Sequence, residues 1–225
     1  MTNDQIWEER YKSRKGIAYW PFDLIVSFVF RFFGKADDRK NIRVLDYGCG
    51  GGNNFWFLIK EGFDGYACDI SNEALKITKN RLASEGLFTS KDRYAQISDT
   101  NLPYPDNYFS CIIDRESLCQ SNWEDIKKIV NEFNRILKPG GCYIGINFTC
   151  FHPDIKDGTY IGNGDWTDFK SGVFQDQGQR HLFSAGDIYE SFENFEILEF
   201  AHLGINSLIA SSLGTSEFIV VAKKK

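Results

Sequence analysis

A short apolar segment that runs into a glycine-rich turn constrains the fold more than any other feature of the chain. Val44 opens the segment, Asp46 stands near its end, and the turn then carries Gly48, Gly50 and Gly52. Glycine has no Cβ atom and adopts positive φ at low cost, so this turn can bend sharply and approach a ligand closely. A strand, a glycine turn and an apolar helix in succession predict a nucleotide-type cofactor site.

The spacing of the glycines and the acid before them narrow the class of ligand. A dinucleotide fingerprint needs a third Gly or Ala, but Asn53 and Phe55 occupy the two positions where it would stand, which disfavours a nicotinamide oxidoreductase. A phosphate-binding loop needs a lysine, and none occurs in the turn before Lys60. Asp46 would repel a pyrophosphate and attract an ammonium or sulfonium group. We therefore expect a positively charged ligand.

The turn resembles motif I of the class I S-adenosylmethionine-dependent methyltransferases, and later motifs of that family follow in order. An acid ends the next predicted strand, segment 99–105 is similar to the family's D-x-x-x-L-P-F, and residues 137–141 match L-K-P-G-G. The resemblance covers residues 42–148 closely and 181–222 loosely. Motif I corresponds here to Asp46, Gly48, Cys49, Gly50 and Gly52.

The resemblance implies a three-layer, Rossmann-like α/β fold with helices on both faces of a mostly parallel seven-stranded sheet whose last strand is antiparallel. Strands are expected at 42–47, 65–70, 93–97, 108–114, 142–148, 195–201 and 217–222. A capping box from Ser121 to Glu124 is expected to start a helix with one apolar stripe. The stripe consists of Ile126, Ile129, Val130, Phe133, Ile136 and Leu137.

The resemblance also assigns roles in binding S-adenosylmethionine, with S-adenosylhomocysteine as product. Asp69 would accept the ribose hydroxyls, and Ile70 would lie against the adenine. Asp99 would take the adenine amino group and the backbone N–H of Thr100 the ring. Tyr11 would reach the methionine end of the cofactor from an N-terminal helix.

Two alternatives remain open among these cofactor residues. Trp7 could instead hold the N-terminal helix as a surface helix, which would leave Tyr11 without that role. Asp114 and Arg115 stand at the carboxyl end of a strand, where open α/β sheets bind ligands. Arg115 either pairs with the carboxylate of the cofactor or pairs with Glu116, which would otherwise serve as a base.

The length of 225 residues and the 42% hydrophobic content predict a single domain, 1–225. It carries an N-terminal helical cap, 1–41, and a glycine-rich lid insertion, 149–180. The cap contains an apolar run, 22–33, that is too short to span a bilayer. We expect this run to pack on the core; a subunit interface, and hence a homodimer, is the second interpretation, and membrane-surface binding the third.

Composition excludes several other classes of function. The net charge of −5 disfavours a dedicated nucleic-acid enzyme, and acids outnumber bases in the lid, which argues against a polyanionic acceptor. The six cysteines form no C-x-x-C pair, so we expect buried thiols in a reducing compartment and no metal site. The amino-terminal residues do not have the pattern of a signal peptide, and we expect a cytoplasmic protein with no membrane partner.

Methyl transfer from a sulfonium is an in-line displacement, so the protein mainly positions the acceptor and excludes water. A hydroxyl acceptor would need a base, and the candidates are His152, His181 and Glu116. The sequence thus predicts a methyltransferase acting on the oxygen or nitrogen of a small molecule, a sugar or another metabolite. A non-catalytic cofactor-binding or regulatory protein and a protein methyltransferase are the alternatives.

Overall fold

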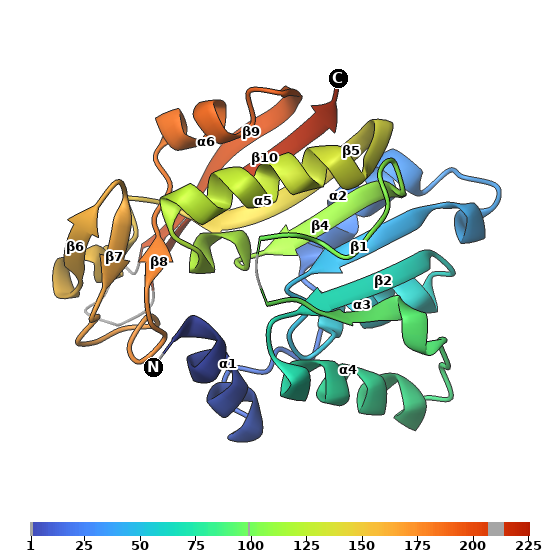
Figure 1. Ribbon diagram of the computed structural model, residues 1–225, viewed down its shortest axis with the longest axis horizontal. Helices are drawn as coiled ribbons and strands as arrows, with labels where there is room; N and C mark the ends of the chain where they lie inside the picture. Colours follow the sequence, from blue (N-terminus) through green and yellow to red (C-terminus); the bar gives the residue numbers. More distant parts are fainter. Residues whose placement is uncertain (1, 99, 207–213) are drawn as a thin grey trace.

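A seven-stranded sheet forms the centre of the structure, a computed structural model that describes residues 2–98, 100–206 and 214–225 (Figure 1). The strand order is β3-β2-β1-β4-β5-β10-β9. The first five strands pair in parallel, and β10 is antiparallel to both of its neighbours. This arrangement confirms the predicted fold class. The strands are β1 (Arg43–Tyr47), β2 (Asp64–Asp69), β3 (Tyr94–Gln96), β4 (Phe109–Arg115), β5 (Leu137–Phe148), β9 (Phe195–Asn206) and β10 (Gly214–Lys224).

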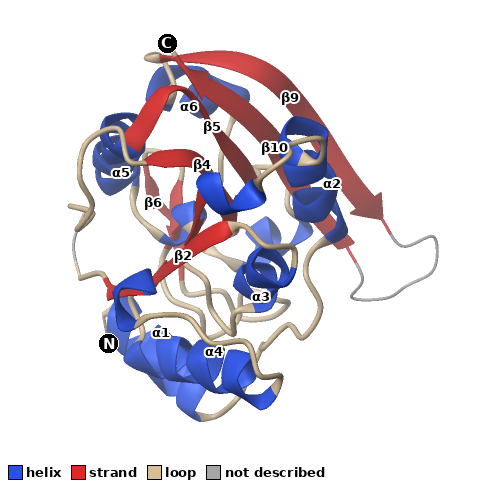
Figure 2. Cartoon of the chain, turned by 90° about the vertical axis from the view of Figure 1, so that its right-hand side faces the viewer, coloured by secondary structure: helices blue, strands red, loops and turns tan. Residues whose placement is uncertain are grey.

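Helices cover both faces of the sheet because its strands bury alternate side chains on opposite sides. The helices are α1 (Asn3–Lys12), α2 (Asp23–Phe33), α3 (Asn53–Lys60), α4 (Asn72–Ser84), α5 (Trp123–Ile136) and α6 (Ala185–Ser191) (Figure 2). In β1, Val44 packs in the same cluster as side chains of α2 and α3, whereas Leu45 packs in the cluster of α5 and α6. Short 3-10 turns are η1 (Arg39–Asn41), η2 (Lys91–Arg93), η3 (Leu118–Gln120) and η4 (Pro153–Asp157).

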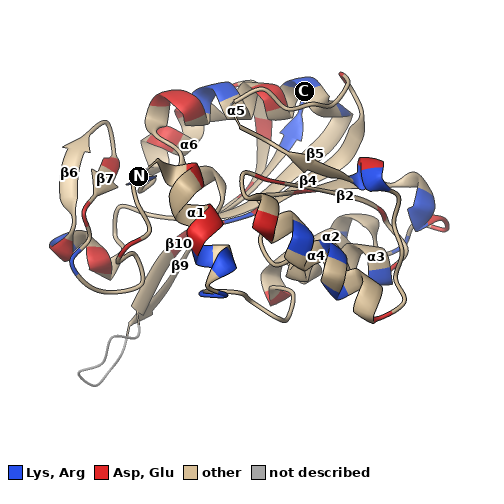
Figure 3. Ribbon diagram, turned by 60° about the horizontal axis from the view of Figure 1, so that its bottom comes forward, with Lys and Arg blue, Asp and Glu red and all other residues tan. Residues whose placement is uncertain are grey.

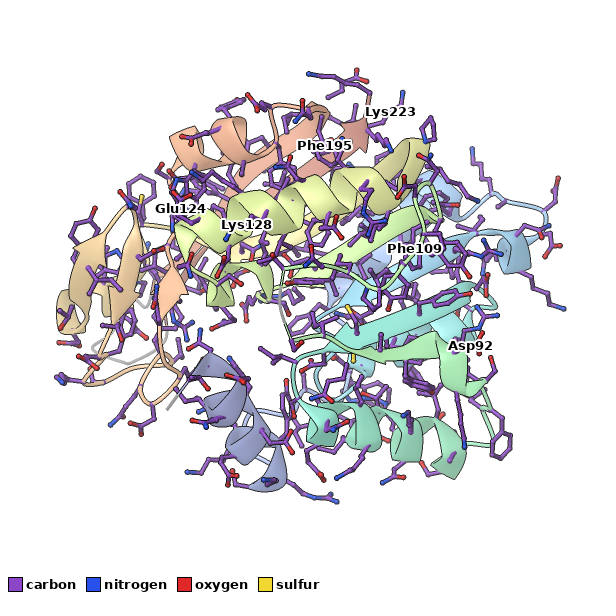
Figure 4. The ribbon with its side chains drawn as sticks, viewed as in Figure 1. Asp92, Phe109, Glu124, Lys128, Phe195 and Lys223 are labelled. Atoms are coloured by element: carbon purple, nitrogen blue, oxygen red, sulfur yellow. The ribbon has the colours of Figure 1, made fainter. Side chains whose placement is uncertain are left out.

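Helix α5 buries the apolar stripe expected from the sequence, while Glu124 and Lys128 lie on its outer face (Figure 4). The predicted capping box is wrong by one residue, because Asn122, not Ser121, is the N-cap. Asn122 Oδ1 accepts a hydrogen bond from the backbone N–H of Asp125 at 2.9 Å. The backbone N–H of Trp123, the first helical residue, donates to the carboxylate of Asp165 instead, which fixes where the helix begins.

Helix α2 packs on the sheet, which is the first of the three interpretations of its apolar sequence. Ile25, Phe28 and Val29 are buried in one cluster with side chains of α3, β4, β5 and β10. Phe32 is 38% exposed, so most of the apolar surface of the helix is accounted for within the chain. A homodimer through this helix stays a prediction.

The predicted lid contains more regular structure than its glycine-rich sequence indicated. It forms a separate three-stranded sheet of β6 (Thr159–Gly162), β7 (Asp165–Thr167) and β8 (Arg180–His181), which lies at the left of Figure 1. Phe169 and Phe174, between β7 and β8, are buried in the main core cluster. The segment is therefore anchored to the domain rather than a free loop.

Candidate functional site

A cleft of about 1260 Å³ opens at the carboxyl ends of the central strands. The residues after β1, β2 and β4 line it from the sheet, α1 covers one side, and residues 167–179 cover another. In a doubly wound sheet this edge is where ligands bind. The sequence-predicted residues that line the cleft are Tyr11, Gly48, Cys49, Gly50, Asp69, Ile70, Thr100, Arg115 and Glu116.

The glycine turn after β1 is packed so closely that side chains would not fit. Gly48 has φ of +64°, and a Cβ atom there would overlap Ser117 Oγ. Gly50 has φ of +53°, and its Cβ would lie 2.5 Å from the hydroxyl oxygen of Tyr11. The turn therefore presents bare backbone to the cleft, with the Tyr11 hydroxyl directly above it.

Asp69, at the end of β2, connects the second strand to the glycine turn. One carboxylate oxygen accepts the backbone N–H of Gly50 at 2.8 Å, and the other accepts that of Ser71 at 2.9 Å. Burial raises the pKa of Asp69 to about 6. The carboxylate retains acceptor capacity for two further hydroxyls, since each of its oxygens has a second lone pair. Asp99, the other acid expected to hold the adenosine, lies outside the described residues.

Helix α1 is tied to both ends of the cleft by polar side chains. Asn3 Nδ2 donates to the backbone oxygen of Gln120 at 2.6 Å and to that of Gln179, in the lid segment, at 3.2 Å. Glu8 accepts hydrogen bonds from Ser71 Oγ at 2.7 Å and from the backbone N–H of Glu73 at 3.1 Å. The helix thus spans from the lid to the start of α4 and carries Tyr11 over the turn.

Arg115 and Glu116, which follow β4, form an ion pair at the wall of the cleft, one of the two arrangements expected for them. Arg115 also pairs with Glu217 Oε1 at 3.2 Å. Glu116 has φ of +62°, and its backbone N–H donates to the oxygen of Ile146 at 2.8 Å. Burial raises the pKa of Glu116 to about 7, although Arg115 opposes this shift.

Three of the predicted cofactor residues support the cleft without lining it, within the described part of the chain. Asp46 is buried and accepts the backbone N–H of Phe55, at the start of α3. Gly52 packs against Thr78 of α4. Asp114 accepts hydrogen bonds from four groups and so shapes the loop that follows β4. Its donors are Tyr143 Oη at 2.8 Å, Asn147 Nδ2 at 2.7 Å, and the backbone N–H groups of Ser117 and Leu118.

The two histidines expected as bases are fully buried and are absent from the described lining of the cleft. His152 Nδ1 accepts the backbone N–H of Asp154 at 3.2 Å, and burial lowers the pKa of His152 to about 4. His181 lies between Asp165, at 2.8 Å from Nδ1, and Asp187, at 3.3 Å from Nε2. Its ring stacks on Trp123 with 5.0 Å between centroids. Both imidazoles therefore have structural partners, and we do not propose either as a base.

Two further aromatic residues of the N-terminal cap, Tyr19 and Trp20, lie on the surface. Tyr19 is 60% and Trp20 68% exposed. Trp20 packs edge-on against Trp56 with 6.2 Å between centroids. Trp7 and Tyr11, by contrast, do line the cleft.

Sequence reasoning missed the residues that assemble the site through long-range contacts. Asn3 and Glu8 of α1, together with Gln120, join segments that are far apart in the chain. No local pattern marks such residues, because their partners are specified only by the fold.

Comparison with known proteins shows which proteins this chain resembles. A family model for a methyltransferase domain matches residues 44–141, which include the glycine turn, Asp69, β3 and β4. This part of the chain, which contains the cofactor end of the cleft, is therefore similar to methyltransferase domains.

The chain is similar in sequence to the ubiquinone/menaquinone biosynthesis C-methyltransferase UbiE of Vibrio cholerae. The two are 33% identical over 114 residues, which are 49% of this chain and 43% of that protein. This chain therefore matches less than half the length of that relative.

Solved structures share the fold of this protein over nearly the whole chain. A S-adenosylmethionine-dependent methyltransferase of Methanosarcina mazei has a TM-score of 0.70 at 19% identity, covering 91% of this chain and 98% of that one. The 1,6-didemethyltoxoflavin-N1-methyltransferase of Burkholderia thailandensis, with bound 1,6-didemethyltoxoflavin and S-adenosylhomocysteine, has a TM-score of 0.69 at 13% identity. That comparison covers 98% of this chain and 86% of that one.

The residues of the cleft fit S-adenosylmethionine, the cofactor of the family. A bare glycine turn admits a close ligand, and Asp69 stands at the end of the next strand with acceptor capacity for hydroxyls. In the described residues, no cluster of His, Cys, Asp and Glu side chains is arranged to hold a metal ion. The described helices are each too short or too polar to cross a membrane.

Proposed function

We propose that this protein transfers a methyl group from S-adenosylmethionine to a small-molecule acceptor. One observation carries the proposal. A single continuous cleft contains the glycine turn and Asp69 at one end and continues past Glu116 to the lid segment. Its volume of about 1260 Å³ is above the range of roughly 300–1,000 Å³ that is usual for a site holding one small ligand. The cleft therefore has room for a cofactor and an acceptor together.

The part of the cleft beyond Glu116, which we call the acceptor half, has aromatic walls. Trp7 lines it from α1, Phe148 from the end of β5, and Phe169 and Phe174 from the lid segment. Asn3 joins α1 to the lid segment, so a protein substrate would have to displace both. These features support a small, partly apolar acceptor from which water is excluded.

Glu116 is the residue of the cleft best suited to accept a proton from the acceptor. The cofactor supplies an activated methyl group on a sulfonium, and the protein contributes orientation and charge. Glu116 lines the cleft, and burial raises its pKa to about 7, near the value at which a general base is most effective. Arg115 holds its carboxylate in place through their ion pair.

We propose that the methyl group is transferred to an oxygen or a nitrogen atom of the acceptor. Because the chain is similar to a C-methyltransferase, transfer to an acidic carbon atom should also be tested. A cytoplasmic location is also proposed, and the free, mostly buried cysteines support a reducing compartment.

Calorimetry with S-adenosylmethionine, S-adenosylhomocysteine and NADH tests the cofactor. We expect binding of the first two and none of NADH; preferential binding of NADH would contradict the proposal. Turnover of radiolabelled methyl donor against sugars, nucleotide sugars, phenols, amines and carboxylates then tests the acceptor. Cofactor binding without transfer to any of these classes would favour a regulatory protein instead.

A further inference from the structure

Arg180, the first residue of β8, is a buried cation with few partners. Its side chain is fully buried, and Nη2 donates one hydrogen bond, to Gln177 Oε1 at 3.0 Å. The Nε and Nη1 atoms have no hydrogen-bond partner in the described part of the chain. Glu116 and Asp154 interact with Arg180 electrostatically, but neither is close enough to form an ion pair with it. The guanidinium therefore keeps unused N–H groups in the interior.

Aromatic contacts offset only part of the cost of burying this charge. The guanidinium carbon lies 3.9 Å from the centroid of the Phe174 ring, 5.7 Å from that of Phe169 and 6.0 Å from that of Phe148. A ring face attracts the charge but accepts none of the N–H groups as a carboxylate would. A buried charge without a counter-ion is costly. An anion is the group that would satisfy the free N–H groups.

Arg180 lies directly behind the wall of the acceptor half of the cleft. Phe174 and Gln177 contact its guanidinium, and the Phe148 ring centroid lies 6.0 Å from the guanidinium carbon; all three residues line the cleft. Glu116, which we propose as the base, also lines the cleft and interacts with Arg180. Arg180 is not among the described residues that line the cleft, whereas Phe174 both contacts the guanidinium and lines the cleft.

We propose that Arg180 binds a carboxylate group of the methyl acceptor, which enters when the Phe174 ring turns aside. This inference rests on the proposed function, because it names the chemical class of acceptor for the same site. A guanidinium matches a planar carboxylate with paired hydrogen bonds. The carboxylates of Glu116 and Asp154 would repel a phosphate dianion more strongly than a carboxylate, which carries a single charge. The acceptor is thus an aromatic or apolar acid with one carboxylate.

Thermal unfolding in saturating S-adenosylhomocysteine tests this proposal with benzoate, benzamide and inorganic phosphate as probes. Benzoate carries a ring for the aromatic walls and one carboxylate, and benzamide has nearly the same shape without the charge. We expect millimolar benzoate to raise Tm, and benzamide and phosphate to leave it unchanged. Equal effects of benzoate and benzamide would overturn the proposal, as would an effect of phosphate alone.

Variants assign the effect to Arg180. In Arg180→Gln we expect S-adenosylhomocysteine to raise Tm as before and benzoate to have no effect, whereas Arg31→Gln, on the exposed face of α2, should respond like the wild type. A benzoate effect that survives in Arg180→Gln would overturn the proposal.

If Arg180→Gln does not fold, Phe174→Leu gives the second test, since a smaller side chain opens the path to Arg180. We expect benzoate to bind about threefold tighter to Phe174→Leu, a change of less than 1 kcal/mol, and unchanged or weaker binding would overturn the proposal.

The same measurement separates this inference from the proposed function. If S-adenosylhomocysteine raises Tm and benzoate does not, the carboxylate site is wrong and the cofactor site stands. If S-adenosylhomocysteine itself has no effect on Tm, the proposed function fails first.

Discussion

At the scale of single residues, the site depends on Asp69 and Gly50, which touch each other. Asp69 accepts the backbone N–H of Gly50, and Gly50 faces the Tyr11 hydroxyl. Because the carboxylate is buried, its pKa is raised to about 6 from an ordinary value of 3.8. The protonation state of Asp69 therefore changes within a pH range that is accessible to experiment.

Binding of S-adenosylhomocysteine is expected to weaken as the pH falls through about 6. The ionised carboxylate of Asp69 accepts the hydroxyls, and its protonated form does so poorly, so affinity at pH 5 should be about tenfold lower than at pH 7. Calorimetry across this range measures the effect. Asp69→Asn should bind weakly with a flat profile between these pH values, and a steep profile in that variant would assign the titration to another group.

The same pKa shift predicts how Asp69 affects folding. The folded protein keeps a proton on Asp69 between pH 3.8 and about 6, where the unfolded chain has released it. The contribution of this group to the free energy of unfolding should therefore fall as the pH rises through that window. In Asp69→Asn this part of the pH dependence should be lost, which denaturant titrations at each pH would reveal.

Replacing Gly50 with alanine should weaken cofactor binding and stability together. The new Cβ would crowd the Tyr11 hydroxyl, and a left-handed φ costs about 1–2 kcal/mol in a residue with a side chain. Gly62→Ala is the matched control, because Gly62 has φ of +81° and no atom within 4 Å of the added Cβ. Both variants should lose stability, but only Gly50→Ala should lose affinity for S-adenosylhomocysteine; equal affinities would contradict our view of the turn.

At the scale of elements, α1 is the part of the fold most directly coupled to the site. It packs beside α4, and its three acidic residues, Asp4, Glu8 and Glu9, come before its two basic residues, Arg10 and Lys12 (Figure 3). Its charges are therefore not an anion-binding patch. Glu8 has a structural role, because its carboxylate accepts two hydrogen bonds at the start of α4 instead of remaining in solvent.

Glu8→Gln should loosen α1 and weaken the binding of S-adenosylhomocysteine. The side-chain amide has one acceptor oxygen instead of two, and it lacks the negative charge that is favourable at a helix N-terminus. We expect a loss of about 1 kcal/mol, which is roughly fivefold in affinity. Glu9→Gln is the control, since Glu9 pairs with Lys12 on the exposed face. Hydrogen exchange of residues 3–12 should quicken in the first variant and not in the second. Equal exchange in both would show that Glu8 does not hold the helix.

At the scale of the whole molecule, the lid and the α/β core meet through Asp165 of β7. Its carboxylate accepts the backbone N–H of Trp123, at the start of α5, at 3.1 and 3.2 Å, and also contacts His181 Nδ1 of β8. One buried acid thus joins two strands of the lid sheet to a helix of the core. This explains why β6 to β8 form an ordered layer despite many glycines.

Asp165→Asn should lower Tm by about 5 °C, because hydrogen bonds to a charged group are weakened at a buried position. Calorimetry of unfolding measures the shift. Asp168→Asn, three residues away on an exposed position, should leave Tm unchanged. A similar loss in both variants would indicate a general effect of charge on the lid rather than this contact.

Much of the fold was predictable because its signals are local. Apolar runs marked the strands, and the stripe of α5 was buried as expected. The start of α5 was misplaced by one residue because the decisive hydrogen bond comes from Asp165, more than forty residues along the chain. His152 and His181, suggested as bases, are buried by the tertiary fold, and His181 is held there by the same distant Asp165.

The sequence by itself determined the glycine turn, the acids that follow successive strands and hence the cofactor family, because backbone conformation and strand order depend on residues close together in the chain. Only the tertiary structure decided which side chains reach the cleft. Asp46 and Asp114 turned inward to support loops, while Asn3, Glu8 and Arg180 came to the site from distant segments. Burial and long-range hydrogen bonds make that choice, and both exist only once the chain has folded.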